Sequence, residues 1–367
     1  MTRIMPDALR HDRPAVAAAT SGARAIRAAS RLCLALLALA GTAKAAEMDP
    51  KLVEAAQKEG TVVWYSGMIV NQILRPMVEA FEKKYPGIKV QYSRASGNDN
   101  ALKIINEARA RRPLADMVDG STAFNALLDT GLIAEYRAVE SARYPADRKD
   151  PKGLWVSPNV YYYTAAYNTD LVKAAEAPQT YDDLLDPKWK GKIAWTYDLT
   201  VGGPPGFIHN ILTIKGQEKG MAYLREFAKQ QPAVIPAAQR VVLDKAIAGE
   251  YPIALMTLSY HSTISAAKGA PIQWLKMPPM IMSVNTLSIL KGAPHPNAAR
   301  LLTEFTLSRE GQEIMAANDY MPADPEVPIK DPGLQPEHGK FTITVVPPEQ
   351  QKAELPKWIA IYNELFK

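Results

Sequence analysis

The chain has 367 residues, 47% of them hydrophobic and 22% charged, with one cysteine and a formal net charge of +5. The first 45 residues hold seven of its 43 basic and two of its 38 acidic residues, so the remainder carries 36 of each and is close to neutral. Without a basic excess the remainder has no electrostatic footprint for a nucleic acid, and one cysteine excludes an intrachain disulfide framework.

The N-terminal segment has the pattern of a cleavable export signal. Three arginines precede a short apolar run at residues 32–40, LCLALLALA, and a small-x-small motif follows at residues 43–45. The run is too short to span a bilayer, which takes about 20 apolar residues. We therefore expect residues 1–45 to be a signal peptide that directs the protein to the periplasm. Cys33 lies at the start of the apolar run and is expected to be removed with it.

Strand and helix patterns alternate beyond the signal peptide. Residues 61–66 (TVVWYS) are β-branched and aromatic and predict a strand, and residues 71–85 have one apolar helical face that ends before a Pro-Gly pair. A second strand is expected at 88–92, a helix at 101–111 and a third strand at 116–118. This β-α-β-α-β order is typical of an α/β sheet covered by helices.

The same alternation restarts in the second half of the chain. Strands are expected at 192–195 and 253–256, and the segment between them contains predicted helices at 220–230 and 240–248. A further helix is expected at 262–268. Two successive α/β units predict two lobes, each with its own core.

Two extended segments connect the predicted lobes. Residues 161–167 (YYYTAAY) and 283–290 (SVNTLSIL) predict a two-stranded hinge. The C-terminal helices expected at 297–317 and 356–366 are predicted to pack back on the first lobe. The predicted boundaries are 46–164 for the first segment of lobe 1, 165–284 for lobe 2, and 285–367 for the return to lobe 1 with the C-terminal helices.

Five stretches carry a family resemblance. They are VVWYSG (62–67), FEKKYPGIKV (81–90), INEARARRPLADMV (105–118), KWKGKIAW (188–195) and KGAPHPNAARL (291–301). In these stretches, and over essentially all of the chain beyond the signal peptide, the sequence resembles the type II periplasmic solute-binding proteins of ABC importers. It is most similar to the branch that contains ferric-ion-binding and 2-aminoethylphosphonate-binding proteins.

The resemblance implies a fold, a mode of action and a partner. The fold is the α/β periplasmic-binding-protein type II fold, with two α/β lobes joined by a two-stranded hinge. A ligand would lie between the lobes and bring about hinge closure. The partner would be an ABC permease in the inner membrane, the protein would act as a monomer, and no cofactor is implied.

Candidate ligand-binding residues follow the predicted strands, because ligands of open α/β sheets bind beyond the carboxyl ends of strands. Hydroxyl and guanidinium groups there can bond an anionic solute, and glycine lets the backbone approach it closely. Each type also has a purely structural alternative, a helix cap for a hydroxyl and a solvated surface for arginine. The candidates are Ser66, Arg94, Ser96, Ser121, Thr122, Thr200, Gly202, Tyr260 and His261, with Tyr163 in the hinge.

A ferric site is not predicted, although iron binding stays an alternative. The resemblance implies a His after the first strand, a Glu after the third and a Tyr pair after a later strand. Here residues 67–71 contain no His, Gly120-Ser121 stands where the Glu would fall, and Ser259-Tyr260 replaces the Tyr pair. Because Fe³⁺ is a hard cation that needs several anionic oxygens, no metal ligands are assigned.

The expected function is reversible capture of a small organic solute, with an anion favoured. The chain has no G-x-S-x-G, H-E-x-x-H or G-x-x-x-x-G-K-[ST] motif and no nucleophile with an evident base, so an enzyme is not predicted. The alternatives are a ferric-ion or other metal-binding protein for import, and a ligand-sensing receptor for a membrane chemoreceptor or kinase.

Overall fold

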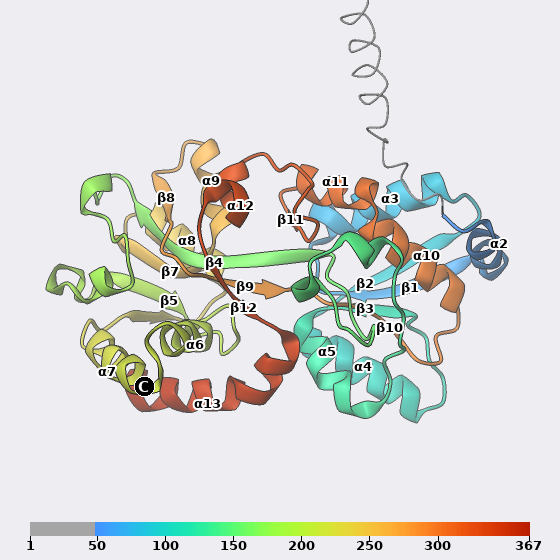
Figure 1. The fold of residues 1–367 in the computed structure, drawn as a ribbon, viewed down its shortest axis with the longest axis horizontal. Helices are drawn as coiled ribbons and strands as arrows, with labels where there is room; N and C mark the ends of the chain where they lie inside the picture. Colours follow the sequence, from blue (N-terminus) through green and yellow to red (C-terminus); the bar gives the residue numbers. More distant parts are fainter. Residues whose placement is uncertain (1–47) are drawn as a thin grey trace, which may run out of the picture. The chain divides into compact units, whose positions relative to one another are not determined.

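The computed structural model describes residues 48–367, which contain two β-sheets flanked by helices (Figure 1). The predicted signal peptide, its cleavage motif and Cys33 lie outside the described residues. Among residues 48–367, no helix combines the length and apolar character that crossing a membrane requires.

The first sheet comes mainly from the N-terminal part of the chain. Its strands are β1 (Thr61–Ser66), β2 (Lys89–Arg94), β3 (Met117–Asp119) and β10 (Leu287–Ile289), in the order β10-β3-β1-β2. β1 is parallel to both β2 and β3, whereas β10 returns from the second half of the chain and pairs antiparallel with β3. The carboxyl ends of the three parallel strands therefore meet at one edge of the sheet.

Six helices pack around this sheet and complete the first lobe. In α3, Met77, Val78 and Phe81 are buried at helical spacing, and the Phe81 ring meets Phe305 of α10 edge-on with 5.6 Å between ring centroids. Burial of such rings is a main stabilising term of the lobe. The helices are α2 (Pro50–Glu59), α3 (Arg75–Lys84), α4 (Gly97–Arg109), α5 (Ser121–Leu127), α10 (Pro296–Leu307) and α11 (Arg309–Ala317).

The second sheet has the order β12-β9-β4-β7-β5-β6, and β8 and β11 also pair with β4. β5 is parallel to β6 and β7, while β4 is antiparallel to β7, β8 and β9. The strands are β4 (Asn159–Asn168), β5 (Ile193–Thr196), β6 (Ala233–Ile235), β7 (Ile253–Leu258), β8 (Ile272–Leu275), β9 (Met280–Val284), β11 (Met321–Pro322) and β12 (Ile343–Val346).

Helices cover the second sheet and define the second lobe. Trp195 of β5 is fully buried, with Phe207 and Phe227 edge-on to it at centroid distances of 5.9 and 5.7 Å. This aromatic cluster forms the centre of the second core. The helices are α6 (Pro204–Lys215), α7 (Gln217–Ala228), α8 (Gln239–Ile247), α9 (Ser259–Ala267), the short α12 (Pro336–Gly339) and α13 (Pro348–Phe366).

The two predicted hinge segments lie side by side, but one of them is not a single strand. β4 pairs with β9 from Val160 opposite Val284, and the chain then leaves the second sheet through Asn285 and Thr286 to enter the first as β10. The predicted strand 283–290 is therefore divided between two sheets. The α/β fold with two lobes and a hinge is confirmed.

The C-terminal helices divide between the lobes, which corrects one prediction. α10 and α11 return to the first lobe as expected. Residues 356–366 do not, because Trp358, Ile361 and Tyr362 of α13 are buried in the core of the second lobe. A lone apolar helical face does not specify which of two cores will bury it, so the sequence left this choice open. The predicted lobe boundaries themselves remain a prediction.

Candidate functional site

A polar cavity of about 280 Å³ lies where loops of both lobes meet the hinge. The first lobe contributes loops after β1, β2 and β3, the second lobe contributes the loop after β5 and the start of α8, and the hinge contributes β4 and the end of β9. It is called the polar cavity below. Its lining residues are Gly67, Gly97, Asp119, Gly120, Ser121, Thr122, Tyr161, Tyr163, Asp198, Thr200, Val201, Gly202, Gln239, Ser283, Val284, Asn285 and Gln351.

The first-lobe wall is formed where β3 turns into α5. Gly120 has φ +113°, a conformation that side-chain-bearing residues rarely adopt, and it directs the chain into the helix at Ser121. The Ser121 hydroxyl donates to the carbonyl of Val284 in the hinge strand, whereas Thr122 is exposed at the cavity. The N–H groups of this first helical turn have no acceptor within the helix.

The second-lobe wall is a tight loop between β5 and α6. The Thr200 hydroxyl donates to Asp198 Oδ2 at 3.1 Å and accepts the Gly202 N–H at 3.2 Å. Gln239 of α8 donates to the Gly202 carbonyl at 3.0 Å. A Cβ on Gly202 would lie 2.5 Å from Gln239 Nε2 and 3.0 Å from the Tyr163 ring, so glycine is required for this close approach.

The hinge supplies two phenols to the cavity. Tyr161 and Tyr163 project from the same face of β4, with 6.4 Å between their ring centroids. Burial raises the pKa of Tyr163 to about 12 and raises that of Tyr161 further, so both hydroxyls are neutral hydrogen-bonding groups near pH 7. Ser283 and Asn285, at the crossing from β9 to β10, line the same wall.

The charged side chains that line the polar cavity are both acidic. Asp119 ends β3 and is 2% exposed, and its Oδ1 accepts the Gly67 N–H at 3.1 Å. Burial raises its pKa to about 6, against the opposing hydrogen bonds from Ser66 and Gly67. Burial also raises the pKa of Asp198. No Lys, Arg or His of residues 48–367 lines this cavity.

The structure brings five of the ten predicted site residues together in the polar cavity. Their role in binding stays a prediction, but their common location agrees with the rule that placed them at strand ends and in the hinge. The five are Ser121, Thr122, Tyr163, Thr200 and Gly202.

Three predicted residues near the first sheet do not line the cavity. Ser66 is fully buried, and its hydroxyl accepts the Met68 N–H at 3.0 Å. Arg94 is exposed, and its Nε donates to the Gly67 carbonyl at 3.4 Å. Ser96 caps α4 by accepting the Asp99 N–H at 3.2 Å. For each of them the structural alternative describes the position that the structure shows.

Tyr260 and His261 lie at the start of α9, outside the polar cavity. The Tyr260 ring forms part of a different pocket, and the His261 ring contacts it edge-on at a centroid distance of 4.5 Å. Burial, followed by the nearby charge of Arg240, lowers the pKa of His261 to about 4.

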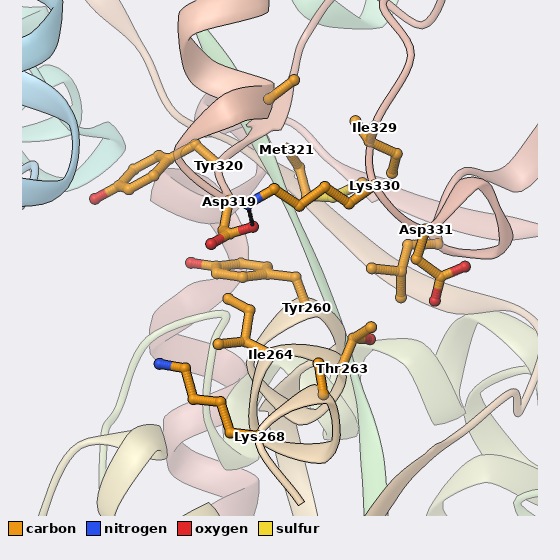
Figure 2. A pocket seen from close by; sticks show the side chains of 13 residues that line it. Tyr260, Thr263, Ile264, Lys268, Asp319, Tyr320, Met321, Ile329, Lys330 and Asp331 are labelled. Atoms are coloured by element: carbon orange, nitrogen blue, oxygen red, sulfur yellow. Dashed lines mark hydrogen bonds and ion pairs between the residues drawn. The ribbon is translucent and has the colours of Figure 1, made fainter.

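The pocket beside Tyr260 has a volume of about 250 Å³ and lies between α9 and the chain that follows α11 (Figure 2). It is called the α9 pocket below. Its lining residues are Tyr260, Thr263, Ile264, Ala267, Lys268, Ala316, Asp319, Tyr320, Met321, Ile329, Lys330, Asp331 and Leu334.

Several cavity residues were missed by sequence reasoning. Asp119 and Asp198 follow β-strands closely, so their position after a strand was a usable signal that went unused. The remaining ones carry no recognisable motif, because they reach the cavity through the hinge crossing or from a distant helix. They are Tyr161, Gln239, Ser283, Asn285 and Gln351.

Metal-binding groups are sparse in the described part of the chain. Residues 48–367 contain no cluster of three or more His, Cys, Asp or Glu side chains that could hold an ion. The nearest alternative is a group of tyrosines in one packed cluster, in which Tyr260 and Tyr320 are buried and Tyr161 and Tyr163 pack against them. The Tyr320 hydroxyl accepts the Ile69 N–H at 3.1 Å.

Comparison with known proteins identifies the family. Residues 112–342 match the family described as bacterial extracellular solute-binding protein, and the chain belongs to this family. A curated relative is the Fe(3+)-binding periplasmic protein of Serratia marcescens, 20% identical over 273 residues, which covers 72% of this chain and 79% of that protein.

Solved structures share the fold. The Trichodesmium protein FutA, in complex with iron and citrate, superposes with a TM-score of 0.70 at 21% identity, covering 83% of this chain and 99% of the other. The periplasmic binding protein AfuA of Actinobacillus pleuropneumoniae, with fructose-6-phosphate bound, gives 0.65 at 22% identity and covers 83% and 98%. At these identities the likeness concerns the fold alone.

Proposed function

We propose that this protein captures a small, polar organic solute in the polar cavity and delivers it to an ABC permease in the inner membrane. The observation that carries the proposal is the composition of the cavity wall, to which both lobes and the hinge contribute polar groups. A solute held there contacts Thr122 on one lobe and Thr200 on the other. Contacts with both lobes favour a closed arrangement, which is how ligand binding shifts a hinge equilibrium.

The lining supports a solute that both donates and accepts hydrogen bonds. Asp198 is an acceptor on one side of the cavity, and the free N–H groups of the first turn of α5 are donors on the other. With two acidic groups and no basic side chain on the wall, a zwitterion or a polyol fits better than a simple anion. The anion favoured by the sequence therefore becomes one arm of the test.

Ferric ion is the second candidate, because one observation favours it. Two phenols of the polar cavity, Tyr161 and Tyr163, pack in one cluster with Tyr260 and Tyr320, and phenolate oxygens suit a hard cation. Relatives named for iron binding are among those reported above. Against it, burial raises the pKa of all four phenols, so releasing their protons requires the charge of the metal itself.

Thermal unfolding of the purified, ligand-free protein tests the proposal. The panel contains zwitterionic amino compounds, polyols, sugar phosphates, carboxylates, phosphonates, and Fe³⁺ with and without citrate. A ligand at 100 times its Kd adds about 2.7 kcal/mol to the free energy of unfolding, a shift of a few degrees for a chain of this size. A shift with one organic class supports solute capture, whereas a shift with Fe³⁺ alone supports the second candidate.

A cavity-blocking variant assigns the shift to the polar cavity. Gly202→Val is expected to abolish the ligand-induced shift, because its side chain would occupy the space between Gln239 and Tyr163. The matched control is Thr213→Val, which introduces the same side chain at an exposed position of α6. A folded Gly202→Val protein that still binds the solute normally would place the site elsewhere. Recovery of the bound solute chemically unchanged separates capture from catalysis.

A further inference from the structure

The α9 pocket has a lining unlike that of the polar cavity. One helical face of α9 forms one wall with Tyr260, Ile264 and Ala267, which are spaced three and four residues apart. The opposite wall comes from the chain after α11, with Met321 and Ile329 among its apolar groups. Because Ile264 and Ile329 are only partly buried, each leaves apolar surface facing the pocket.

The charged groups of the pocket are not all engaged by the protein. Lys330 crosses the pocket to pair with Asp319, with 2.7 Å between Nζ and Oδ1 (Figure 2). Asp331 accepts the Gly333 N–H at 3.0 Å. Lys268, at the C-terminal end of the α9 wall, is exposed and makes no hydrogen bond or ion pair with any of residues 48–367. The pocket thus joins an apolar interior to one unpaired cation.

We propose that the α9 pocket is a second ligand site, separate from the polar cavity, which binds a small apolar carboxylate. The apolar part lies against Ile264, Met321 and Ile329, and the carboxylate pairs with Lys268. An apolar lining with a few convergent polar groups is the usual composition of a small-molecule site. The volume of about 250 Å³ limits the occupant to a short-chain or single-ring molecule.

The two cavities are neighbours, which gives the second site a possible means of influence on the first. Tyr320 lines the α9 pocket, and its hydroxyl bonds the N–H of Ile69, two residues from Gly67 in the wall of the polar cavity. The proposal concerns the second site itself, however, and does not depend on which solute fills the polar cavity.

Ligand-observed NMR titrations of the purified protein test the site with four probes: butanoate, hexanoate, hexan-1-ol and hexylammonium. Hexanoate should bind about tenfold more tightly than butanoate, since each buried methylene contributes about fourfold. It should bind up to about fivefold more tightly than hexan-1-ol, the range of an exposed ion pair. Hexylammonium should bind more weakly than hexan-1-ol.

Three variants locate the binding. Lys268→Ala should remove the advantage of hexanoate over hexan-1-ol, because only the ion pair is lost. Ala267→Phe, which fills the pocket mouth, should weaken both probes at least tenfold. The matched control, Ala222→Phe on an exposed face of α7, should leave both unchanged, as should Gly202→Val in the polar cavity. Circular dichroism confirms that each variant is folded.

The proposal is overturned by any of three results. The first is that no probe binds the folded protein at millimolar concentration. The second is that folded Ala267→Phe binds hexanoate as the parent does. The third is that Gly202→Val abolishes hexanoate binding, which would place the carboxylate in the polar cavity; that result would leave the proposed solute capture intact.

Discussion

Asp119 is predicted to make the stability of the protein depend on pH in a direction opposite to that of most carboxylates. Burial raises its pKa to about 6 from an ordinary value of 3.8. Between these two values the folded state binds more protons than the unfolded state, so the free energy of unfolding falls as pH rises from about 4 to 6. The shift of about two units corresponds to about 3 kcal/mol.

The Asp119→Asn variant isolates this contribution. Asparagine keeps the shape and can still accept the Gly67 N–H, but it does not titrate. The variant should therefore gain about 3 kcal/mol relative to the parent between pH 4 and pH 7. Urea unfolding followed by circular dichroism measures both proteins at each pH, and their difference cancels the titration of all other groups. Asp170→Asn, at an exposed aspartate, is the matched control.

One outcome would refute the reasoning about Asp119. If the stability difference between variant and parent is constant from pH 4 to pH 7, the carboxyl has the same pKa in the folded and unfolded states. Its burial would then be relieved by water or by a change in the cavity, and the acidic wall that supports a donor-bearing solute would have to be redrawn.

Three further predictions follow from single residues. Glu304→Ala should cost about 3 to 5 kcal/mol, because the buried Glu304 carboxylate accepts the Tyr136 hydroxyl and two backbone N–H groups, whereas exposed Glu310→Ala should cost under about 1 kcal/mol in urea unfolding; equal losses would contradict this. His261, whose pKa is lowered to about 4, should lose up to about 3 kcal/mol of stability as pH falls from 6.5 to 4, and a His261→Gln variant with the same pH profile as the parent would be evidence against it. Arg94→Ala should leave solute affinity within about twofold, because Arg94 does not line the polar cavity, and a tenfold loss by calorimetry would return it to the site.

The strands and the hinge were largely readable from the sequence. The predicted strand 61–66 is β1 as observed, and 253–256 is the start of β7, because apolar and β-branched runs bounded by turn residues report a buried strand directly. Half of the site prediction rested on the same local signals. A polar residue after a strand, such as Ser121 or Thr200, reaches the carboxyl edge of a sheet whatever the rest of the chain does.

What the sequence determined by itself was thus local: the elements, their alternation and the loops at strand ends. Only the tertiary structure decided which loops meet. Arg94 and Thr122 both follow strands of the first sheet, yet only Thr122 lines the polar cavity. Tyr260 follows β7 but contributes its ring to the α9 pocket, and α13 is buried by the second core. These outcomes depend on strand order and on the hinge crossing, which join residues more than 70 positions apart and leave no periodic signal in the chain.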